Sequence, residues 1–270
     1  MPYVKTPRGQ FFYQESGSTG PIVYLLHGLT AKCQDWETVP GDLSHAGFHV
    51  FAFDMKGHGM SDKPESGYSP EDLARDVDAS AVVLNHEKIH LVGHSAGGRT
   101  ALYFATMFPA KVLTLTIIDQ TLTADPEGWK KSQETYAEYP APFSSGEDLD
   151  GFLLERFPDS ERRRHYEKGQ FHRREDGLWN WNFSILAALE IQRLGRAKEI
   201  HWLLKRVKCP ILFLKAGKSE FVTLEEAEKI RETMPSGQLV TIEEAGHGLF
   251  RDDPQAFQDI LVQFLKAVPS

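Results

Sequence analysis

Short, predominantly apolar runs alternate with longer amphipathic segments along the chain. Continuous apolar runs are typical of strands buried on both faces of a sheet. They occupy residues 22–26, 50–54, 89–92, 112–118 and 211–214. Two further strands are predicted, at 10–14 on an edge of the sheet and at 238–242 as the last strand.

The segments between the runs predict helices, at residues 36–46, 70–84, 99–105, 224–234 and 254–268. The second of these has a clear beginning, because Ser69 suits the N-cap, Pro70 suits the first turn, and the acidic Glu71 and Asp72 favour the positive end of the helix dipole. Alternation of strand and helix predicts an α/β fold, with a mostly parallel, doubly wound sheet that carries helices on both faces.

The pattern changes between residues 121 and 206, where the buried strands give way to helical stretches rich in charged and aromatic residues. We therefore predict a core formed by residues 1–120 and 207–270, with residues 121–206 inserted as a helical cap. Most of the cap's aromatic residues are expected to form its own core, and two or three to face the pocket. They are Phe143, Phe152, Phe157, Phe171, Trp179, Trp181 and Phe183.

Length and charge narrow the function classes. The 270 residues suit one large domain with an insertion, and 41% hydrophobic with 25% charged residues is an ordinary globular balance. A net charge of −8 argues against nucleic acid or an anionic membrane as the main partner. No apolar stretch approaches the roughly 18 residues of a membrane helix. We expect a monomer or homodimer that acts on a small molecule.

Two cysteines, Cys33 and Cys209, are predicted to be free thiols. Cys33 follows the carboxyl end of one strand and Cys209 precedes another strand, so the two lie at opposite edges of the sheet. A disulfide needs Cα atoms within about 7 Å of each other. Free thiols, with an N-terminus that lacks the apolar core of a signal peptide, predict a cytoplasmic protein.

The strongest chemical motif is Gly-x-Ser-x-Gly at residues 93–97, directly after an apolar run and directly before a helix. This context defines a nucleophile elbow, a sharp turn that exposes the serine hydroxyl at the carboxyl end of a strand. Ser95 is then the candidate nucleophile. Because Ala96 begins the following helix, its amide is free to donate a hydrogen bond to an oxyanion.

Other candidate residues fall at the same edge of the predicted sheet. His27-Gly28-Leu29 and Asp119 each follow the carboxyl end of a strand, as Ser95 does. In an open parallel sheet, ligands bind outside the carboxyl ends of the strands. The sequence therefore predicts one site that includes all of them.

Four motifs, taken in order, resemble those of the α/β-hydrolase superfamily over nearly the whole chain. They are His27-Gly28, the segment Asp54-Met55-Lys56-Gly57-His58-Gly59-Met60-Ser61, the elbow Gly93-His94-Ser95-Ala96-Gly97-Gly98, and Gly246-His247. Lys56 stands where the family usually has Arg. The resemblance implies a serine hydrolase whose base is His247, and an oxyanion hole formed by the backbone amides of Leu29 and Ala96.

The acid of the triad has two candidates. Most members of the family carry an aspartate in the loop after the strand at 211–214, and in one register Glu220 takes that position. In the other register Ser219 takes it, which resembles a subgroup of small esterases whose acid follows the strand after the nucleophile helix. Asp119 occupies that second place. We favour Asp119 over Glu220, since a residue at the end of a buried strand is rigidly held.

These residues predict a hydrolase that cleaves carboxylic esters through an acyl-Ser95 intermediate, with His247 moving the proton and Asp119 orienting it. No cofactor and no metal are expected. The aromatic cap favours a substrate with an apolar part, and thioesters and lactones are further candidates. The alternatives are a ligand-binding receptor on a hydrolase scaffold, and a cofactor-free haloperoxidase or lyase. His86-Glu87-Lys88-Ile89-His90 matches a zinc motif, but that motif needs a single helix.

Overall fold

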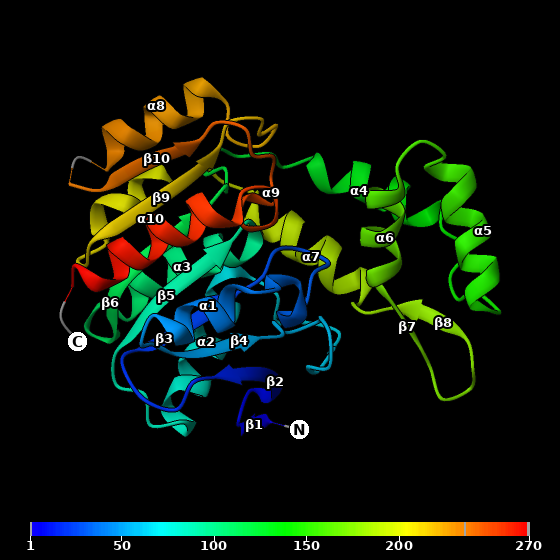
Figure 1. Cartoon of the computed structure of the whole chain (residues 1–270), viewed down its shortest axis with the longest axis horizontal. Coiled ribbons are helices and arrows are strands. Elements are labelled where there is room, and N and C mark those ends of the chain that lie inside the picture. Colours follow the sequence, from blue (N-terminus) through cyan, green and yellow to red (C-terminus); the bar gives the residue numbers. More distant parts are fainter. Residues whose placement is uncertain (1, 235, 269–270) are drawn as a thin grey trace.

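The apolar runs of the sequence form the centre of an eight-stranded sheet (Figure 1). The computed structural model describes residues 2–234 and 236–268. The strands lie in the order β1-β2-β4-β3-β5-β6-β9-β10. Their bounds are β1 (Tyr3–Thr6), β2 (Gly9–Ser16), β3 (Ile22–Leu26), β4 (His49–Phe53), β5 (Ile89–His94), β6 (Val112–Ile118), β9 (Ile211–Ala216) and β10 (Gln238–Ile242).

Strand direction confirms the predicted class. β2 pairs antiparallel with β1 and with β4, whereas every neighbouring pair from β4 to β10 is parallel. Within β3, Tyr24 and Leu26 enter one apolar cluster while Val23 and Leu25 enter another. Because successive side chains of a strand point to opposite faces, the sheet is covered on both sides.

Helices supply the two covers. The cluster that contains Tyr24 includes residues of α2 (Pro70–Val83), α3 (Ala96–Met107) and α8 (Leu224–Thr233). The other cluster includes residues of α1 (Val39–His45) and α10 (Pro254–Lys266). Three short turns complete the core: η1 (Cys33–Trp36), η2 (Pro109–Lys111) and α9 (Leu249–Asp252). The single helix predicted at 36–46 is therefore two elements, since the chain turns at Glu37 with a φ of 52°.

Most of the segment between β6 and β9 stands to one side of the sheet (Figure 1), while its last helix and turn contribute residues to the apolar core. It contains α4 (Gly128–Ala137), α5 (Gly146–Arg156), α6 (Glu161–Gly169), β7 (Phe171–Arg173), β8 (Trp179–Trp181), α7 (Ile185–Gly195) and η3 (His201–Arg206). β7 and β8 form an antiparallel pair that the sequence did not predict. Most of the cap's aromatic side chains pack against one another in an apolar cluster that includes Phe143, Phe171, Trp181 and Phe183.

The chain enters and leaves this segment through two linkers that lie side by side. Asp125 N donates to Arg196 O, and Ile200 N donates to Leu122 O, each at 2.9 Å. The buried carboxylate of Glu226, on α8, accepts a hydrogen bond from Leu122 N at 2.6 Å. The two linkers are thus hydrogen-bonded to each other, and the first is also bonded to α8 of the core through Leu122.

Glu226 makes further contacts with both linkers: Thr121 and Thr123 belong to the first, and His201 follows the second. Its Oε1 accepts from Thr121 Oγ1, its Oε2 accepts from Thr123 Oγ1, and Oε2 lies 3.2 Å from His201 Nε2. Burial by itself would raise the pKa of this carboxyl, but His201 and the hydrogen-bond donors outweigh it and lower the pKa to about 2. Glu226 is therefore a buried, charged acceptor that binds the residues at both ends of the cap.

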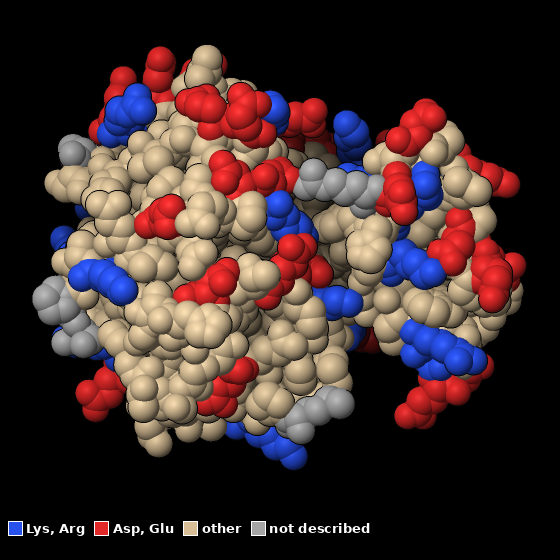
Figure 2. Space-filling model, in the orientation of Figure 1, with Lys and Arg blue, Asp and Glu red and all other residues tan. Residues whose placement is uncertain are grey.

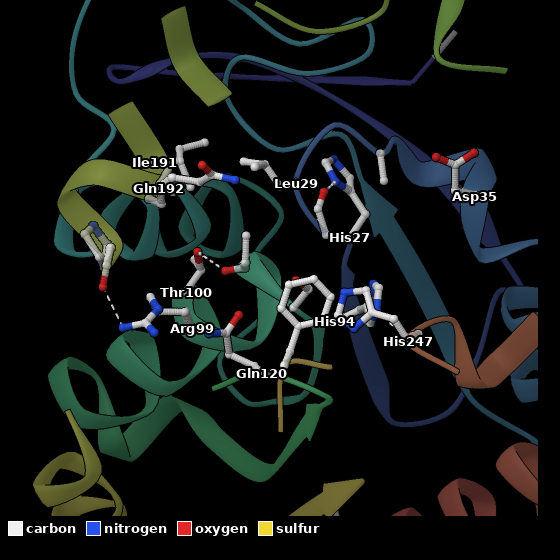
Figure 3. Close-up of a pocket in the computed structure, with 18 of the residues that line it drawn as sticks. His27, Leu29, Asp35, His94, Arg99, Thr100, Gln120, Ile191, Gln192 and His247 are labelled. Atoms are coloured by element: carbon white, nitrogen blue, oxygen red, sulfur yellow. Dashed lines mark hydrogen bonds between the residues drawn. The ribbon is translucent and has the colours of Figure 1, made fainter. Parts of the chain in front are cut away.

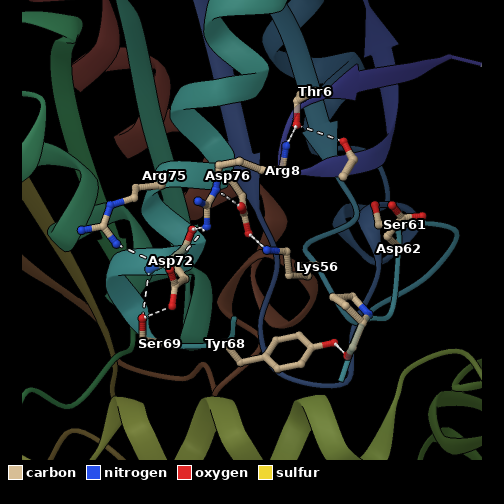
Figure 4. A network of polar contacts seen from close by, with 12 residues as sticks. Thr6, Arg8, Lys56, Ser61, Asp62, Tyr68, Ser69, Asp72, Arg75 and Asp76 are labelled. Carbon is tan, nitrogen blue, oxygen red and sulfur yellow. Dashed lines mark hydrogen bonds and ion pairs between the residues drawn. The ribbon is translucent and has the colours of Figure 1, made fainter. Parts of the chain in front are cut away.

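Lys56, the departure from the usual motif, takes part in a polar network below β4 (Figure 4). Lys56 Nζ lies 2.7 Å from Asp76 Oδ2, and both side chains are buried. Arg8 joins Asp76 and Asp72 from the turn after β1. Burial raises the pKa of Asp76, although Lys56 and Arg8 oppose that shift. Lys56 and Arg8 each bind one oxygen of the buried Asp76, so the loop from Asp54 to Ser61 is attached to α2 through Lys56.

Charged side chains of both signs are interspersed on the face of the molecule seen in Figure 2. On the face seen in Figure 2, Lys and Arg stand singly or in small groups among the more numerous Asp and Glu. No helix in the described part of the chain is both long enough and apolar enough to cross a lipid bilayer.

Candidate active site

Ser95 occupies the tight turn between β5 and α3. Its φ of 51° and ψ of −120° lie where residues with a side chain are rarely found. Ser95 N donates to Ile118 O at 2.9 Å, at the end of the neighbouring β6. The strained turn is thus anchored to the sheet, and it places Ser95 on the wall of a cavity at the carboxyl end of the strands.

Glycine is required on both sides of this serine. A Cβ added to Gly93 would lie 2.3 Å from Gly97 O, and one added to Gly97 would lie 2.2 Å from Leu26 O. Both distances are far below a normal contact with a backbone oxygen. Any side chain at either position would therefore push α3 away from β3 and β5 and move Ser95.

His247 lies in the loop after β10 and contacts Asp119 directly. The distance from His247 Nδ1 to Asp119 Oδ2 is 2.8 Å. The Asp119 carboxylate is fully buried, and its Oδ1 accepts from Ala216 N at 3.0 Å. Since a carboxylate accepts hydrogen bonds, Nδ1 is the protonated nitrogen and Nε2 is left as a base. Among the hydrogen bonds of the described residues, none joins His247 to Ser95, although both line the same cavity.

Ser219 completes the surroundings of Asp119. Its Oγ donates to Asp119 Oδ2 at 2.7 Å, and it accepts from the backbone amides of Phe221 and Val222 at 3.0 Å each. The hydroxyl therefore holds the loop after β9 and the carboxylate at the same time. The Asp119 carboxylate receives hydrogen bonds from three groups in all: a backbone amide, a hydroxyl and an imidazole.

Glu220, the other candidate acid, points elsewhere. It is exposed, and it lines a groove on the outer side of His247. Within the described residues, no hydrogen bond or ion pair links Glu220 to His247. In the register of this loop, Ser219 rather than Glu220 lies against the Asp119–His247 pair, so the geometry supports Asp119 as the acid.

Leu29 and Ala96, whose backbone amides are the predicted oxyanion-hole donors, both line the cavity beside Ser95. No hydrogen bond within the described chain uses either N–H. His27 orients the first of them: Met55 N donates to His27 Nε2 at 2.9 Å, so Nδ1 carries the proton and donates to Gly28 O at 2.7 Å. In a trans peptide the C=O and N–H point in opposite directions, which turns the Leu29 N–H away from His27.

The neutral state of His27 is secured by its surroundings. Burial lowers its pKa to about 4, although the hydrogen bond to Gly28 raises it slightly. An uncharged imidazole can accept from Met55 N and donate to Gly28 O at once. The hydrogen bond from His27 Nδ1 to Gly28 O therefore fixes the peptide group that carries the Leu29 N–H.

His247 is held between two rings. Its centroid lies 4.5 Å from that of His94 and 4.4 Å from that of Phe221. His94 Nε2 lies 2.8 Å from His247 O, so its N–H can donate to the loop that carries the imidazole. Burial, with the nearby His247, lowers the pKa of His94, and it stays neutral in this position. The ring of His247 can thus tilt only within a narrow slot.

The catalytic cavity encloses about 220 Å³ between the sheet and α7 (Figure 3). Its wall is mixed: Leu29 and Ile191 are apolar, while Thr100, Gln120 and Gln192 bring polar atoms (Figure 3). A second groove of about 580 Å³ adjoins it under the cap and shares Tyr166, Phe221 and His247 with it. Three of the cap aromatics named above line that groove, namely Phe157, Trp181 and Phe183.

The zinc-like motif does not form a helix in this fold. His90 is a buried residue of β5 whose Nδ1 lies 2.8 Å from Thr114 Oγ1, and His86 lies before the strand, 2.8 Å from Tyr24 OH. The two imidazoles serve different parts of the core. Among the residues that the structure describes, no group of three or more His, Cys, Asp or Glu is arranged to hold a metal ion.

Several residues of the site had no distinct signal in the sequence. Ser219 appeared only as the residue of one register, and Phe221, Gln192 and Arg196 were not singled out. Their positions depend on contacts between distant elements: Ser219 bonds to a residue 100 positions away. The one sequence feature that pointed to Ser219 was its place in the loop after β9, in one of the two registers considered for the acid.

The chain belongs to the alpha/beta hydrolase fold family, whose sequence model matches residues 21–254. Among curated relatives, a 2-(acetamidomethylene)succinate hydrolase of Mesorhizobium japonicum is 26% identical over 256 residues, which cover 94% of this chain and 91% of that protein. A crystal structure of E-2-(acetamidomethylene)succinate hydrolase superposes with a TM-score of 0.86 at 25% identity, covering 98% of each chain.

A second solved structure, described as a marine microorganism esterase, has a TM-score of 0.81 and 27% identity. It covers 94% of this chain and 98% of that one. These likenesses extend over core and cap together, since the matched share of each chain is nearly complete.

Proposed function

We propose that this protein is a serine hydrolase that cleaves carboxylic esters through an acyl-Ser95 intermediate. The observation that carries the proposal is the 2.8 Å contact between His247 Nδ1 and the buried Asp119 carboxylate, on the same cavity as the strained Ser95. The relatives support the class of reaction, because one is named as a hydrolase and another as an esterase.

The reaction would proceed in two halves. Ser95 Oγ forms a bond to the ester carbonyl carbon while its proton passes to His247 Nε2, and the carbonyl oxygen becomes an oxyanion opposite the Leu29 and Ala96 amides. The C–O bond to the alcohol then breaks, and His247 returns the proton to the leaving oxygen. Water repeats the sequence on the acyl-enzyme, which releases the acid and restores Ser95.

Asp119 has a distinct part in this scheme. It keeps the proton on Nδ1, so that Nε2 faces the cavity as a base, and its negative charge stabilises the imidazolium formed in each half. Thioesters and lactones contain the same acyl carbon and are further candidate substrates. The aromatic groove under the cap suits an apolar part of the substrate that extends past His247.

The test is pre-steady-state kinetics with p-nitrophenyl acetate, followed by mass spectrometry of the labelled peptide. We expect a burst of nitrophenol close to one equivalent, an acetyl group on Ser95, and steady turnover that Ser95→Ala abolishes. A stable adduct on Ser95 without turnover would favour the ligand-receptor alternative. No adduct, with activity retained in Ser95→Ala, would overturn the proposal.

A further inference from the structure

One end of the catalytic cavity carries an excess of positive charge. Among the described residues that line it, the charged side chains other than histidine are Asp35, Arg99, Arg196 and Arg251. Asp35 lies on the opposite side of the cavity from Arg99 (Figure 3), and burial raises its pKa although Lys32 and Arg251 oppose that shift. The single acidic side chain among these lining residues is therefore away from Arg99.

Arg99 is buried without a carboxylate partner. It is 5% exposed, and its two terminal nitrogens donate to Gly195 O and Thr121 O, each at 2.6 Å. No ion pair in the described chain includes it. Burial, together with the nearby Arg196, lowers its pKa to about 10, so it remains charged. Carbonyl oxygens satisfy its N–H groups, and the buried Glu226 is near enough to oppose the lowering of its pKa without forming an ion pair with it.

Arg196 lies close to the reacting groups. Its guanidinium carbon is 5.8 Å from the ring centroid of Phe221, whose centroid is 4.4 Å from that of His247. One aromatic ring thus separates Arg196 from the candidate base. Its ion pair with Asp125 is long, at 3.3 Å, and the Asp125 side chain is 48% exposed. The Arg196 side chain is 21% exposed, so solvent reaches this pair mainly from the Asp125 side and weakens it.

Gln192 precedes Arg196 by four residues, so the two side chains share one face at the end of α7. Gln192 lines the cavity, and its Oε1 is buried without a hydrogen-bond partner. In Figure 3 the side chain of Gln192 projects from α7, and Thr100 and Gln120 lie on the opposite wall of the cavity. Turning the carboxamide over by 180° exchanges its oxygen and its NH₂, and in that orientation the NH₂ can donate a hydrogen bond to a bound carboxylate.

We propose that Arg196 and Gln192 bind a carboxylate carried by the substrate, with the fixed charge of Arg99 behind them. The substrate class is then small esters that bear a free carboxylate, such as half-esters of short dicarboxylic acids. The inference rests on the proposed function, since the ester carbonyl must reach Ser95 while the carboxylate reaches Arg196. A cavity of about 220 Å³ limits the acyl part to a few carbons.

Matched substrates test this directly. Monomethyl succinate and monomethyl glutarate would be compared with methyl butyrate and methyl valerate, and acetoxyacetate with ethyl acetate, by titration of the released acid. We expect kcat/KM to be at least 10-fold higher for the charged member in one or more of these sets. Equal values throughout, or a preference for the neutral esters, would overturn the inference while the proposed function stands.

Three variants locate the site. Arg196→Gln and Gln192→Leu should each lower kcat/KM for the charged ester, by about 10- to 100-fold for Arg196→Gln because it removes a charged hydrogen bond, with less than 3-fold change for the neutral ester. The effect should appear mainly in KM. Arg193→Gln is the matched control, since Arg193 is exposed on the same helix and pairs with Glu190. Loss of the neutral activity in equal proportion would contradict a carboxylate site.

Binding separates this inference from the proposed reaction. Calorimetric titration of Ser95→Ala with monomethyl glutarate should give binding that Arg196→Gln in the same background weakens 10-fold or more. That result would support the carboxylate site even if no ester were hydrolysed. Failure of the half-ester to bind tighter than methyl valerate to Ser95→Ala would count against it, whatever the esterase assay gives.

Discussion

Ser219 Oγ and Asp119 Oδ2 lie 2.7 Å apart, and that carboxylate oxygen is also the one that contacts His247 Nδ1. In this register a hydroxyl lies in the loop after β9 where the resemblance to most family members places the acid, and it contacts the proposed acid, Asp119, at the end of β6. Because the same hydroxyl accepts from Phe221 N and Val222 N, it joins the loop over the imidazole to the carboxylate beneath it.

Replacing Ser219 with Ala should lower kcat by about 10- to 100-fold, since a hydrogen bond to a charged group contributes roughly 1.5–3 kcal/mol. KM should change little, because Ser219 lies behind the imidazole rather than in the substrate cavity. The measurement is steady-state kinetics with a neutral ester. Ser219→Thr retains the Oγ and should recover most of the activity; an Ala variant with full kcat would show that the contact does not orient the pair.

The choice of acid can be decided by two amide substitutions. Asp119→Asn should reduce kcat on the order of 10⁴-fold, because an amide cannot hold the proton on Nδ1 or stabilise the imidazolium. Glu220→Gln should stay within a few-fold of the parent, as Glu220 is exposed and lines only the outer groove. Similar, mild losses from both variants would contradict the assignment.

Acid should destabilise the fold before the carboxyl groups titrate. Burial lowers the pKa of His27 to about 4, of His58 to about 3 and of His90 to about 4, and it also lowers that of His94. A histidine with a depressed pKa is protonated in the unfolded chain first. The free energy of unfolding should therefore fall as pH drops from about 6.5 toward 4, with these four groups adding about three to four protons to the slope.

Urea unfolding at several pH values between 7 and 5 measures that slope. His90→Gln should reduce it by about one proton, while His45→Gln, at an exposed position, should leave it unchanged. A slope near zero in this range would mean that the four histidines are not kept neutral by the fold.

Glu226→Gln tests the contribution of the buried carboxylate that binds both ends of the cap. The variant should lose about 1–3 kcal/mol of stability at pH 7, since several donors would lose a charged acceptor. The pKa of Glu226 is lowered to about 2, so its contribution is complete above about 4.5, the pKa in the unfolded chain, and declines as pH falls toward 2.

The difference between parent and Glu226→Gln, measured by denaturant unfolding, should therefore shrink between pH 5 and pH 3. Glu225→Gln, one residue earlier and exposed, is the control and should cost almost nothing. A pH-independent difference would assign the loss to packing rather than to charge.

The central strands could be predicted from the sequence because burial on both faces leaves a plain apolar run. β3 and β6 coincide with the runs at 22–26 and 112–118. The pair β7–β8 could not be predicted in this way: each strand has three residues, and His172 and Arg173 interrupt the apolar pattern. Such a short pair depends on the aromatic cluster around it rather than on its own sequence.

Some residues of the candidate site could likewise be predicted from local sequence, and others could not. Ser95 and His247 stand in local motifs whose glycines and neighbouring elements are visible in the sequence. The choice between Asp119 and Glu220 depended on a one-residue register in the loop after β9, which only the contact across 100 positions resolves geometrically. The charge at Arg99 and Arg196 was equally hidden, since no local pattern tells which arginines face a cavity.

The hydrogen bond from Ser95 N to Ile118 O links the nucleophile's turn to the residue just before Asp119. Adjacent strands joined this way shift together, so bending of the sheet carries hydroxyl and carboxylate along as a unit. With Asp119 as the acid, the loop after β9 supplies a neutral hydroxyl, that of Ser219, instead of a charged group.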